Sequence, residues 1–210
     1  MFTGIVAAVG KITDLSAAGT EPGAGVRLTI DAGDLPIADV ILGDSIAING
    51  ACMTVVSKTD RSFAVDVSRE SLNCTAGLDA PGEVNLEKAL TLADRLGGHL
   101  VSGHVDGLGL VTRFEPVGES WNLVIEAPSE LGKYLAIKGS IVVNGVSLTV
   151  NRVSDTPTGC VFSINVIPHT MTVTTLRNLT AGSRVNLEID LIARYVERML
   201  SSSAGPQRAG

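Results

Sequence analysis

Short hydrophobic runs alternate with clusters of Gly, Asp, Asn and Pro along most of the chain. Residues 25–32, 45–58 and 62–70 are three such runs, and each is rich in β-branched side chains. Turn-forming residues recur at intervals of roughly 8–12 positions, a spacing typical of a small barrel or sandwich and not of βαβ units. The pattern therefore predicts an all-β protein, with tight type I′ turns at the Asn-Gly pairs 49–50 and 144–145.

Two segments depart from this pattern and predict helices. Residues 85–99 contain helix-favouring residues and run into Gly-Gly, a natural helix stop. Residues 188–203 carry an apolar stripe at helical spacing, formed by Leu191, Ile192, Tyr195, Val196, Met199 and Leu200. This stripe packs either on its own barrel or on other copies of the chain, and we favour the second. Residues 204–210 are expected to form a disordered tail.

The two halves of the chain repeat one another. Residues 48–55 (INGACMTV) resemble residues 143–150 (VNGVSLTV). Three further pairs occur in the same order, namely 2–10 with 101–109, 70–78 with 169–177, which align weakly, and 82–87 with 183–188. Each pair is offset by about 100 residues, which indicates a tandem duplication. We expect a first barrel at 1–97, a second at 98–188, a helix at 189–203 and the tail at 204–210.

The composition argues against several classes of protein. The 210-residue chain has 22 acidic and 16 basic residues and only 3% aromatic residues, which disfavours nucleic-acid binding. The start of the chain lacks the basic region of a signal peptide, and no apolar run is long enough to span a bilayer. Three cysteines without CxxC spacing fit a reducing compartment better than a disulfide framework. We therefore expect a cytoplasmic protein.

The chemistry of the chain is expected where the two halves differ. Polar and ionisable positions have diverged, whereas the glycines and the strand pattern have not. The differing pairs are Ile5 and His104, Cys52 and Ser147, and Glu70 and His169. This predicts two pockets of one shape with different chemical tasks. Plainer interpretations stay open, with Cys52 as a small buried hydrophobic residue and the Asn-Gly pairs as hairpin corners alone.

Other ligand classes are disfavoured by spacing. His99 and His104 are five residues apart, which suits a metal site on neither a helix nor a strand, and no carboxylate-rich segment is near them. The glycine-rich stretch 97–109 lacks the order of residues of a dinucleotide- or triphosphate-binding loop. We therefore expect no metal ion and no nucleotide.

Five segments together resemble a known family. They are MFTGIV (1–6), NGACMTV (49–55), GGHLVSGHVDG (97–107), NGVSLTV (144–150) and IPHT (167–170). In this order they resemble riboflavin synthases of the α-chain type, over nearly the whole chain. The resemblance implies two six-stranded Greek-key barrels, a C-terminal helix and a homotrimer. Its active site would lie between the first barrel of one subunit and the second barrel of a neighbour.

The resemblance also implies a reaction without cofactor or metal. Two molecules of 6,7-dimethyl-8-ribityllumazine would give riboflavin and 5-amino-6-ribitylaminouracil, by transfer of a four-carbon unit from one to the other. A duplicated binding domain is a natural way to hold two copies of one substrate. The hydroxyl-rich ribityl chains would find partners in the repeated Asn-Gly-x-x-x-Thr frame.

Site residues follow from the same motifs. The resemblance assigns Phe2 and Thr3 to the substrate in general. It assigns to the first-barrel site Gly4, Ile5, Val6, Cys52, Met53, Thr54, Asp66, Val67, Ser68, Arg69, Glu70 and Ser71. It assigns to the second-barrel site Gly103, His104, Val105, Lys138, Ser147, Leu148, Thr149, Asn165, Val166, Ile167, Pro168, His169 and Thr170. The expected catalytic residues are Cys52, Ser147 and His104, followed by Ser45 and Thr149.

Two positions depart from the pattern of many members. Asn144 stands where many have aspartate, and His169 where others have glutamate. Both weaken any mechanism that depends on one fixed base at these positions.

Alternatives to the enzyme remain. Lumazine-holding antenna proteins share the duplicated fold without turning the ligand over, but they typically lose one pocket, whereas both sets of motifs are present here. A β-barrel interaction module would leave MFTGIV and GGHLVSGH unexplained. Lumazine synthase is a further candidate partner that the resemblance suggests.

Overall fold

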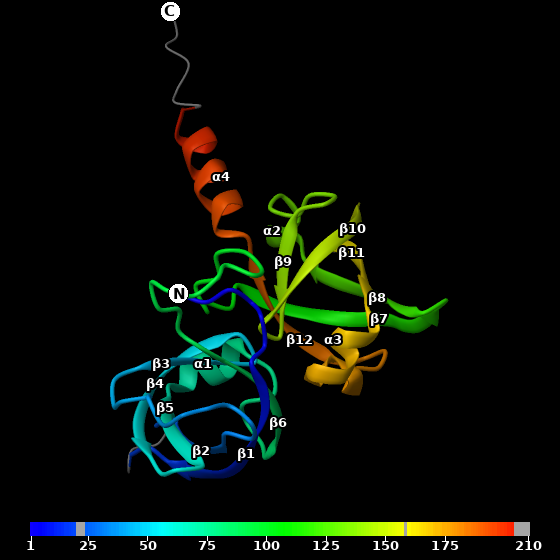
Figure 1. The fold of residues 1–210 in the computed structure, drawn as a ribbon. Coiled ribbons are helices and arrows are strands. Elements are labelled where there is room, and N and C mark those ends of the chain that lie inside the picture. Colours follow the sequence, from blue (N-terminus) through cyan, green and yellow to red (C-terminus); the bar gives the residue numbers. More distant parts are fainter. Residues whose placement is uncertain (20–23, 158, 204–210) are drawn as a thin grey trace, which may run out of the picture.

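Two closed β-barrels lie next to each other, and a C-terminal helix projects away from them (Figure 1). The computed structural model describes residues 1–19, 24–157 and 159–203, so the expected tail at 204–210 lies outside it. Each barrel has six antiparallel strands. The predicted architecture of two six-stranded barrels followed by a helix is therefore confirmed.

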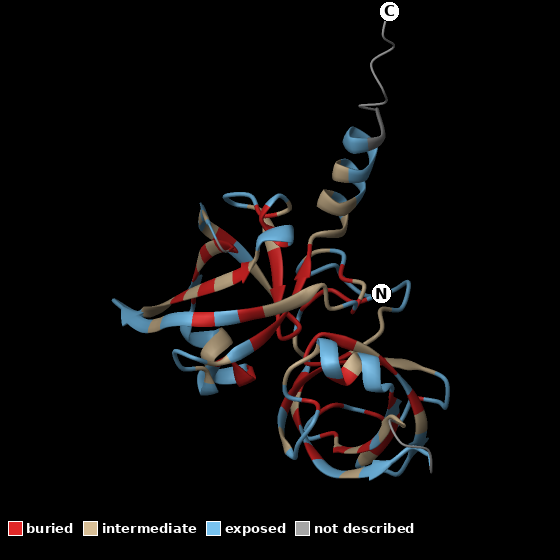
Figure 2. Cartoon of the chain, turned by 180° about the vertical axis from the view of Figure 1, so that it is seen from behind, coloured by how far each residue is buried: buried red, intermediate tan, exposed pale blue. Residues whose placement is uncertain are grey.

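The first barrel closes in the order β1-β2-β5-β4-β3-β6. Its strands are β1 (Ala8–Ala17), β2 (Val26–Asp31), β3 (Ser45–Ile48), β4 (Ala51–Lys58), β5 (Ser62–Val67) and β6 (Gly82–Lys88). Alternate side chains point inward and fill the interior with Ile, Leu, Val and Phe, which appears as red bands along the strands in Figure 2. Because side chains fill so small a barrel, a ligand must bind on its outer surface.

The second barrel repeats this arrangement. Its strands are β7 (Gly107–Val117), β8 (Ser120–Pro128), β9 (Ser140–Val143), β10 (Val146–Thr156), β11 (Gly159–Val166) and β12 (Arg184–Ile189). They close in the order β10-β11-β8-β7-β12-β9, which is the order of the first barrel when β7 is matched with β1. The tandem duplication is thus visible in the topology as well as in the sequence.

The two Asn-Gly pairs form the predicted type I′ turns. In the first, φ is 48° at Asn49 and 84° at Gly50; in the second, φ is 47° at Asn144 and 82° at Gly145. These turns also meet one another between the barrels. A Cβ atom on Gly50 would lie 2.8 Å from the backbone nitrogen of Gly145, so this contact requires glycine.

Four buried asparagines join the barrels around these turns. Within each barrel, Asn49 Oδ1 accepts the N–H of Asn85, and Asn144 Oδ1 accepts the N–H of Asn186, at 2.9 and 2.8 Å. Across the interface, Asn85 Nδ2 donates to the carbonyl of Asn144 and Asn186 Nδ2 to that of Asn49. The side chains of Asn49 and Asn144 are therefore committed to the fold. The expectation that this frame supplies them to a ribityl chain is wrong.

The predicted helix at 85–99 is also wrong. Residues 82–88 form β6, which pairs with β1 and β3, and residues 89–100 form an irregular loop. The favourable helix propensity of this segment is overridden by strand pairing and by burial of Asn85 and Glu87. Four short helical turns escaped prediction, namely α1 (Arg69–Cys74), α2 (Ser129–Gly132), α3 (Pro168–Val173) and η1 (Thr175–Asn178).

The C-terminal helix α4 (Leu191–Ser203) is anchored at its base and exposed beyond it. Arg194 pairs with Asp106, and Lys133 Nζ lies 2.7 Å from Glu197 Oε1. The apolar stripe expected on this helix is mostly exposed, with Ile192 64% and Tyr195 60% accessible, as the pale colour of α4 in Figure 2 illustrates. In this chain the stripe is therefore not packed on its own barrel.

No helix of the described residues is both long and apolar enough to cross a membrane.

Candidate active site

The segment before β1 crosses from the first barrel to the second. The N–H of Ser147 on β10 donates to the carbonyl of Gly4 at 2.7 Å. Val6 packs against the core of the second barrel. A Cβ atom on Gly4 would lie 2.7 Å from Ser147 Cβ, and the φ of Gly4 is +74°, so only glycine permits this approach. Residues 2–6 thus form the first crossing segment.

The segment before β7 makes the reciprocal crossing. The N–H of Cys52 on β4 donates to the carbonyl of Gly103 at 2.8 Å. Val105 packs against the core of the first barrel. Residues 101–105 thus form the second crossing segment, and a short antiparallel bridge between Phe2 and Val101 joins the two segments.

The crossing segments reverse the grouping expected from the sequence. We expected Gly4, Ile5 and Val6 beside Cys52, and Gly103, His104 and Val105 beside Ser147. The structure instead brings the first crossing segment to Ser147 and the second to Cys52. That grouping assumed that each half folds on itself, whereas each half sends its first residues to the other.

A buried carboxylate holds each crossing segment. Glu87 Oε1 accepts the N–H and the hydroxyl of Thr3, both at 2.7 Å, and Glu87 Oε2 accepts the N–H of Gly4. Glu188 Oε1 accepts the N–H and hydroxyl of Ser102 at 2.6 and 2.7 Å, and Glu188 Oε2 accepts two further N–H groups. Burial raises the pKa of both glutamates, although these donors partly oppose it.

Each carboxylate comes from one barrel, while the glycine carbonyl that it fixes faces the other barrel. Glu87 lies on β6 and positions Gly4 against Ser147; Glu188 lies on β12 and positions Gly103 against Cys52. This arrangement is therefore present in two copies. We name them the Cys52 pocket and the Ser147 pocket, after the two predicted pockets and the strand residues that differ between them, although neither residue lines the two cavities described below.

Strand alternation decides which expected residues face outward. Cys52 and Thr54 alternate with the buried Met53 on β4, and Ser147 and Thr149 occupy the matching positions on β10. Several expected binding residues instead lie inside the barrels, so that only their backbone could meet a ligand; these are Met53, Val67 and Val166. Leu148 packs against the core of the second barrel.

The exposed Asp66 near the end of β5, and the segments that follow β5 and β11, face the solvent. Asp66 pairs with Arg27, Nε to Oδ1 at 2.7 Å, which holds the pKa of this carboxyl below its usual value. Ser68 caps α1 by accepting the N–H of Ser71. The remaining expected residues of these segments are exposed or half-buried, namely Arg69, Glu70, Ile167, Pro168, His169 and Thr170.

Lys138 and Asn165 lie elsewhere on the second barrel. Lys138 has a positive φ of 66°, and its Nζ is 3.4 Å from Asn151 Oδ1. Asn165 Oδ1 accepts the hydroxyl of Ser120 at 2.7 Å. Both residues line a shallow cavity of about 720 Å³ on the outer face of β8, β10 and β11. Cys52 and Ser147 do not line it.

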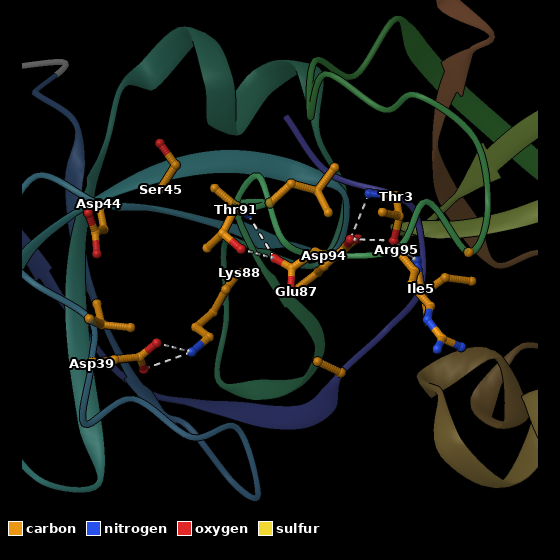
Figure 3. A pocket seen from close by; sticks show the side chains of 15 residues that line it. Thr3, Ile5, Asp39, Asp44, Ser45, Glu87, Lys88, Thr91, Asp94 and Arg95 are labelled. Carbon is orange, nitrogen blue, oxygen red and sulfur yellow. Dashed lines mark hydrogen bonds and ion pairs between the residues drawn. The ribbon is translucent and has the colours of Figure 1, made fainter.

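A second open cavity, also of about 720 Å³, lies between the first crossing segment, one end of β3 and β6, and the loop that follows β6 (Figure 3). Thr3 and Ile5 of the first crossing segment border it, and Ser45 lines its far side. Lys88 is paired across it with Asp39 at 2.7 Å. The cavity thus brings the expected residue Ser45 onto the same hollow as the first crossing segment, but not next to Cys52.

The side-chain hydrogen-bond partner of Ser147 was not predicted from the sequence. His99 Nδ1 lies 2.8 Å from Ser147 Oγ. By its spacing in the sequence, His99 stands out only as half of a metal site with His104. No group of three His, Cys, Asp or Glu side chains within the described ranges is arranged to hold a metal ion. The two glutamates were missed too, although the repeated VNLE (84–87 and 185–188) was their signal.

Two related small-molecule sites on duplicated barrels define the class of this protein. The lumazine-binding domain model matches the chain twice, over residues 3–89 and 102–190. Riboflavin synthase of Photobacterium phosphoreum is 44% identical over 95% of this chain and 89% of its own length. That of Mycobacterium bovis is 44% identical over 97% of this chain and its whole length. The chain belongs to the riboflavin synthase family of lumazine-binding proteins.

Solved structures of LumP share the fold of this chain. LumP complexed with 6,7-dimethyl-8-(1'-D-ribityl)lumazine has a TM-score of 0.76 and 26% identity, over 90% of this chain and 99% of LumP. LumP complexed with riboflavin has a TM-score of 0.77 and 27% identity over the same shares.

Proposed function

We propose that this chain converts two molecules of 6,7-dimethyl-8-ribityllumazine into riboflavin and 5-amino-6-ribitylaminouracil. The observation that carries the proposal is the doubled site. Both copies have a crossing segment, a glycine carbonyl bonded to the strand residue and a buried glutamate that fixes it. A reaction between two copies of one substrate needs two such sites.

The chemistry that we propose depends mainly on orientation. The C7 methyl of the lumazine is acidic because the ring delocalises the carbanion, so no strong base is required. Holding two reacting rings in the correct geometry can supply roughly 7–11 kcal/mol. The crossing segments suit this task, because hydrogen bonds to the buried carboxylates restrict their movement.

The polar side chains at the outer strand faces would assist proton transfer and addition at C7. Cys52 and Ser147 are half-buried, and Thr54 and Thr149 are exposed beside them. His104 is exposed, and its backbone N–H is held by Glu188 at 3.1 Å. We therefore keep Cys52, Ser147 and His104 as the proposed catalytic residues, with Thr149 and Ser45 in supporting roles.

The second candidate is a protein that holds lumazine or a flavin without turning it over. The structures of LumP favour it, because this fold is complexed there with a ribityl lumazine and with riboflavin. Against it, the Cys52 and Ser147 pockets both keep their crossing segment and glutamate, and the curated relatives are named riboflavin synthase.

We also propose that three chains associate through α4, which would place the first barrel of one chain near the second barrel of another. The exposed positions Ile192, Tyr195 and Val196 support this role, since a stripe of this kind is stable when it is covered.

Truncation after Glu188 should abolish the trimer in light scattering. A trimer that persists would reject α4 as the contact, and the same assay with added lumazine synthase tests that association.

A cytoplasmic location completes the proposal, since Cys52, Cys74 and Cys160 are all free thiols.

Turnover separates the two candidate functions. The purified chain is mixed with the lumazine alone, and absorbance is followed for riboflavin. Sustained formation of riboflavin supports the enzyme. Tight binding of lumazine without riboflavin would support the carrier.

A further inference from the structure

The hydroxyl of Ser147 has a partner that the doubled site does not explain. His99 Nδ1 lies 2.8 Å from Ser147 Oγ, within hydrogen-bond distance. His99 belongs to the loop after β6, whereas Ser147 lies on β10 of the other barrel. Among the residues that the structure describes, Cys52 makes a backbone bond to Gly103 but no side-chain hydrogen bond. The two pockets therefore differ at this point.

The backbone around His99 is built for this contact. The N–H of His99 donates to the carbonyl of Thr3 at 3.1 Å, and the next carbonyl, that of Gly4, accepts the N–H of Ser147. A Cβ atom on Gly98 would lie 2.2 Å from the Thr3 carbonyl oxygen and 2.8 Å from Ser147 Cβ. The loop can approach Ser147 only because this residue is glycine.

The other ring nitrogen of His99 is buried and has no hydrogen-bond partner within the described part of the chain. A neutral imidazole has one donor and one acceptor nitrogen. If Nδ1 accepts the hydroxyl hydrogen of Ser147, then Nε2 carries the ring N–H. Burial lowers the pKa of His99, and the charge of Asp190 opposes this only in part, so the ring is neutral near pH 7 and free to accept.

We propose that His99 is a positioning residue that accepts the hydroxyl hydrogen of Ser147 and so turns the oxygen lone pairs of Ser147 toward the bound ring. This inference rests on the proposed function, which it deepens. The hydrogen stays shared between Oγ and Nδ1, and no covalent bond forms. The Ser147 pocket thereby becomes the one in which a polarised hydroxyl faces the lumazine, whereas the Cys52 pocket lacks such a pair.

Two substitutions separate this role from simple packing. His99→Phe keeps a flat ring but removes both nitrogens, and His99→Asn places an amide oxygen near the position of Nδ1. We expect His99→Phe to lower kcat for riboflavin formation at least about tenfold, with KM changed less than about twofold. His99→Asn should recover most of this loss. Leu92→Ala, at a fully exposed position of the same loop, is the matched control and should keep wild-type kcat.

The decisive comparison uses Ser147→Ala. If His99 acts through Ser147, adding His99→Phe to Ser147→Ala causes no further loss of kcat. An equal loss in both backgrounds, or wild-type kcat in His99→Phe, would overturn the proposal. The ¹⁵N shift of Nδ1 tests the pair without turnover, since Ser147→Ala should move it. An unchanged shift overturns the pair, whereas wild-type protein that forms no riboflavin overturns only the proposed function.

Discussion

Cys52 and Ser147 occupy equivalent positions with unequal surroundings. Each donates its backbone N–H to a glycine carbonyl of the opposite half, but within the described residues only Ser147 has a side-chain hydrogen bond to a histidine. Aligning the halves identified the difference between them, because the strand frames match residue for residue. It did not identify His99, since its contact with Ser147 depends on a loop whose path the sequence pattern does not fix.

The first prediction concerns Cys52. Cys52→Ala should lower kcat by roughly 10²-fold, because a group that assists proton transfer is lost, while lumazine affinity changes little. Steady-state riboflavin formation and fluorescence titration of lumazine measure the two quantities. Equal losses in both would show that Cys52 is only part of the pocket wall.

The second prediction concerns pH. The pKa of folded His99 is lowered by burial below the unfolded value of about 6.5. Its contribution to the free energy of unfolding is therefore complete above pH 6.5 and is lost as the pH falls through the folded pKa. Between pH 7.5 and pH 5, the free energy of unfolding measured in urea should fall more for the wild type than for His99→Asn, whose side chain cannot titrate. If the unfolding free energies of the two proteins changed with pH in parallel, the role of His99 in the pH dependence would be rejected.

At the scale of elements, the crossing segments depend on two buried carboxylates. A glutamate that accepts only N–H and O–H donors is poorly replaced by glutamine, whose amide turns one acceptor into a donor. Glu87 and Glu188 do the same task for the two pockets, so they can be tested separately.

The third prediction concerns Glu87 and Glu188, each of which serves one pocket. Glu188→Gln should destabilise the fold by about 1–3 kcal/mol in urea unfolding, because a donor is forced against buried donors. It should also weaken lumazine binding at the Cys52 pocket, while Glu87→Gln weakens the Ser147 pocket. If both substitutions weakened lumazine binding equally at the two pockets, Glu87 and Glu188 would not each act on one pocket.

Strands and tight turns were predictable, whereas the exchange of segments between halves was not. Asn49 and Gly50 specify a type I′ turn through their tolerance of positive φ, which is a local property. The same kind of reasoning failed at 85–99, because Glu87 is held by tertiary contacts that helix propensity ignores. The predicted grouping of Gly4 with Cys52 was wrong for a similar reason, because the crossing depends on contacts between the two halves of the chain.

At the scale of the whole molecule, the two barrels are fixed to one another by the Asn-Gly turns and the four asparagines. The turns approach so closely that neither glycine can carry a side chain. A rigid interface of this kind sets the relation between the two pockets within one chain.

The fourth prediction tests that interface. Gly50→Ala should destabilise the protein more than Gly118→Ala, whose added Cβ would meet nothing within 4 Å. Both glycines have positive φ, so both changes cost about 1–2 kcal/mol of backbone strain. The steric clash at Gly145 should add at least about 1 kcal/mol more for Gly50→Ala. Equal unfolding free energies would show that the barrels separate freely at these turns.

The doubled site is proposed to bring together two molecules of one substrate for the transfer of a four-carbon unit. The most direct test of this proposal is the stoichiometry of the reaction with the purified chain and the lumazine alone. Riboflavin and 5-amino-6-ribitylaminouracil should each appear in half the molar amount of lumazine consumed. Lumazine that binds and is recovered unchanged, or any other ratio of products, would contradict the account.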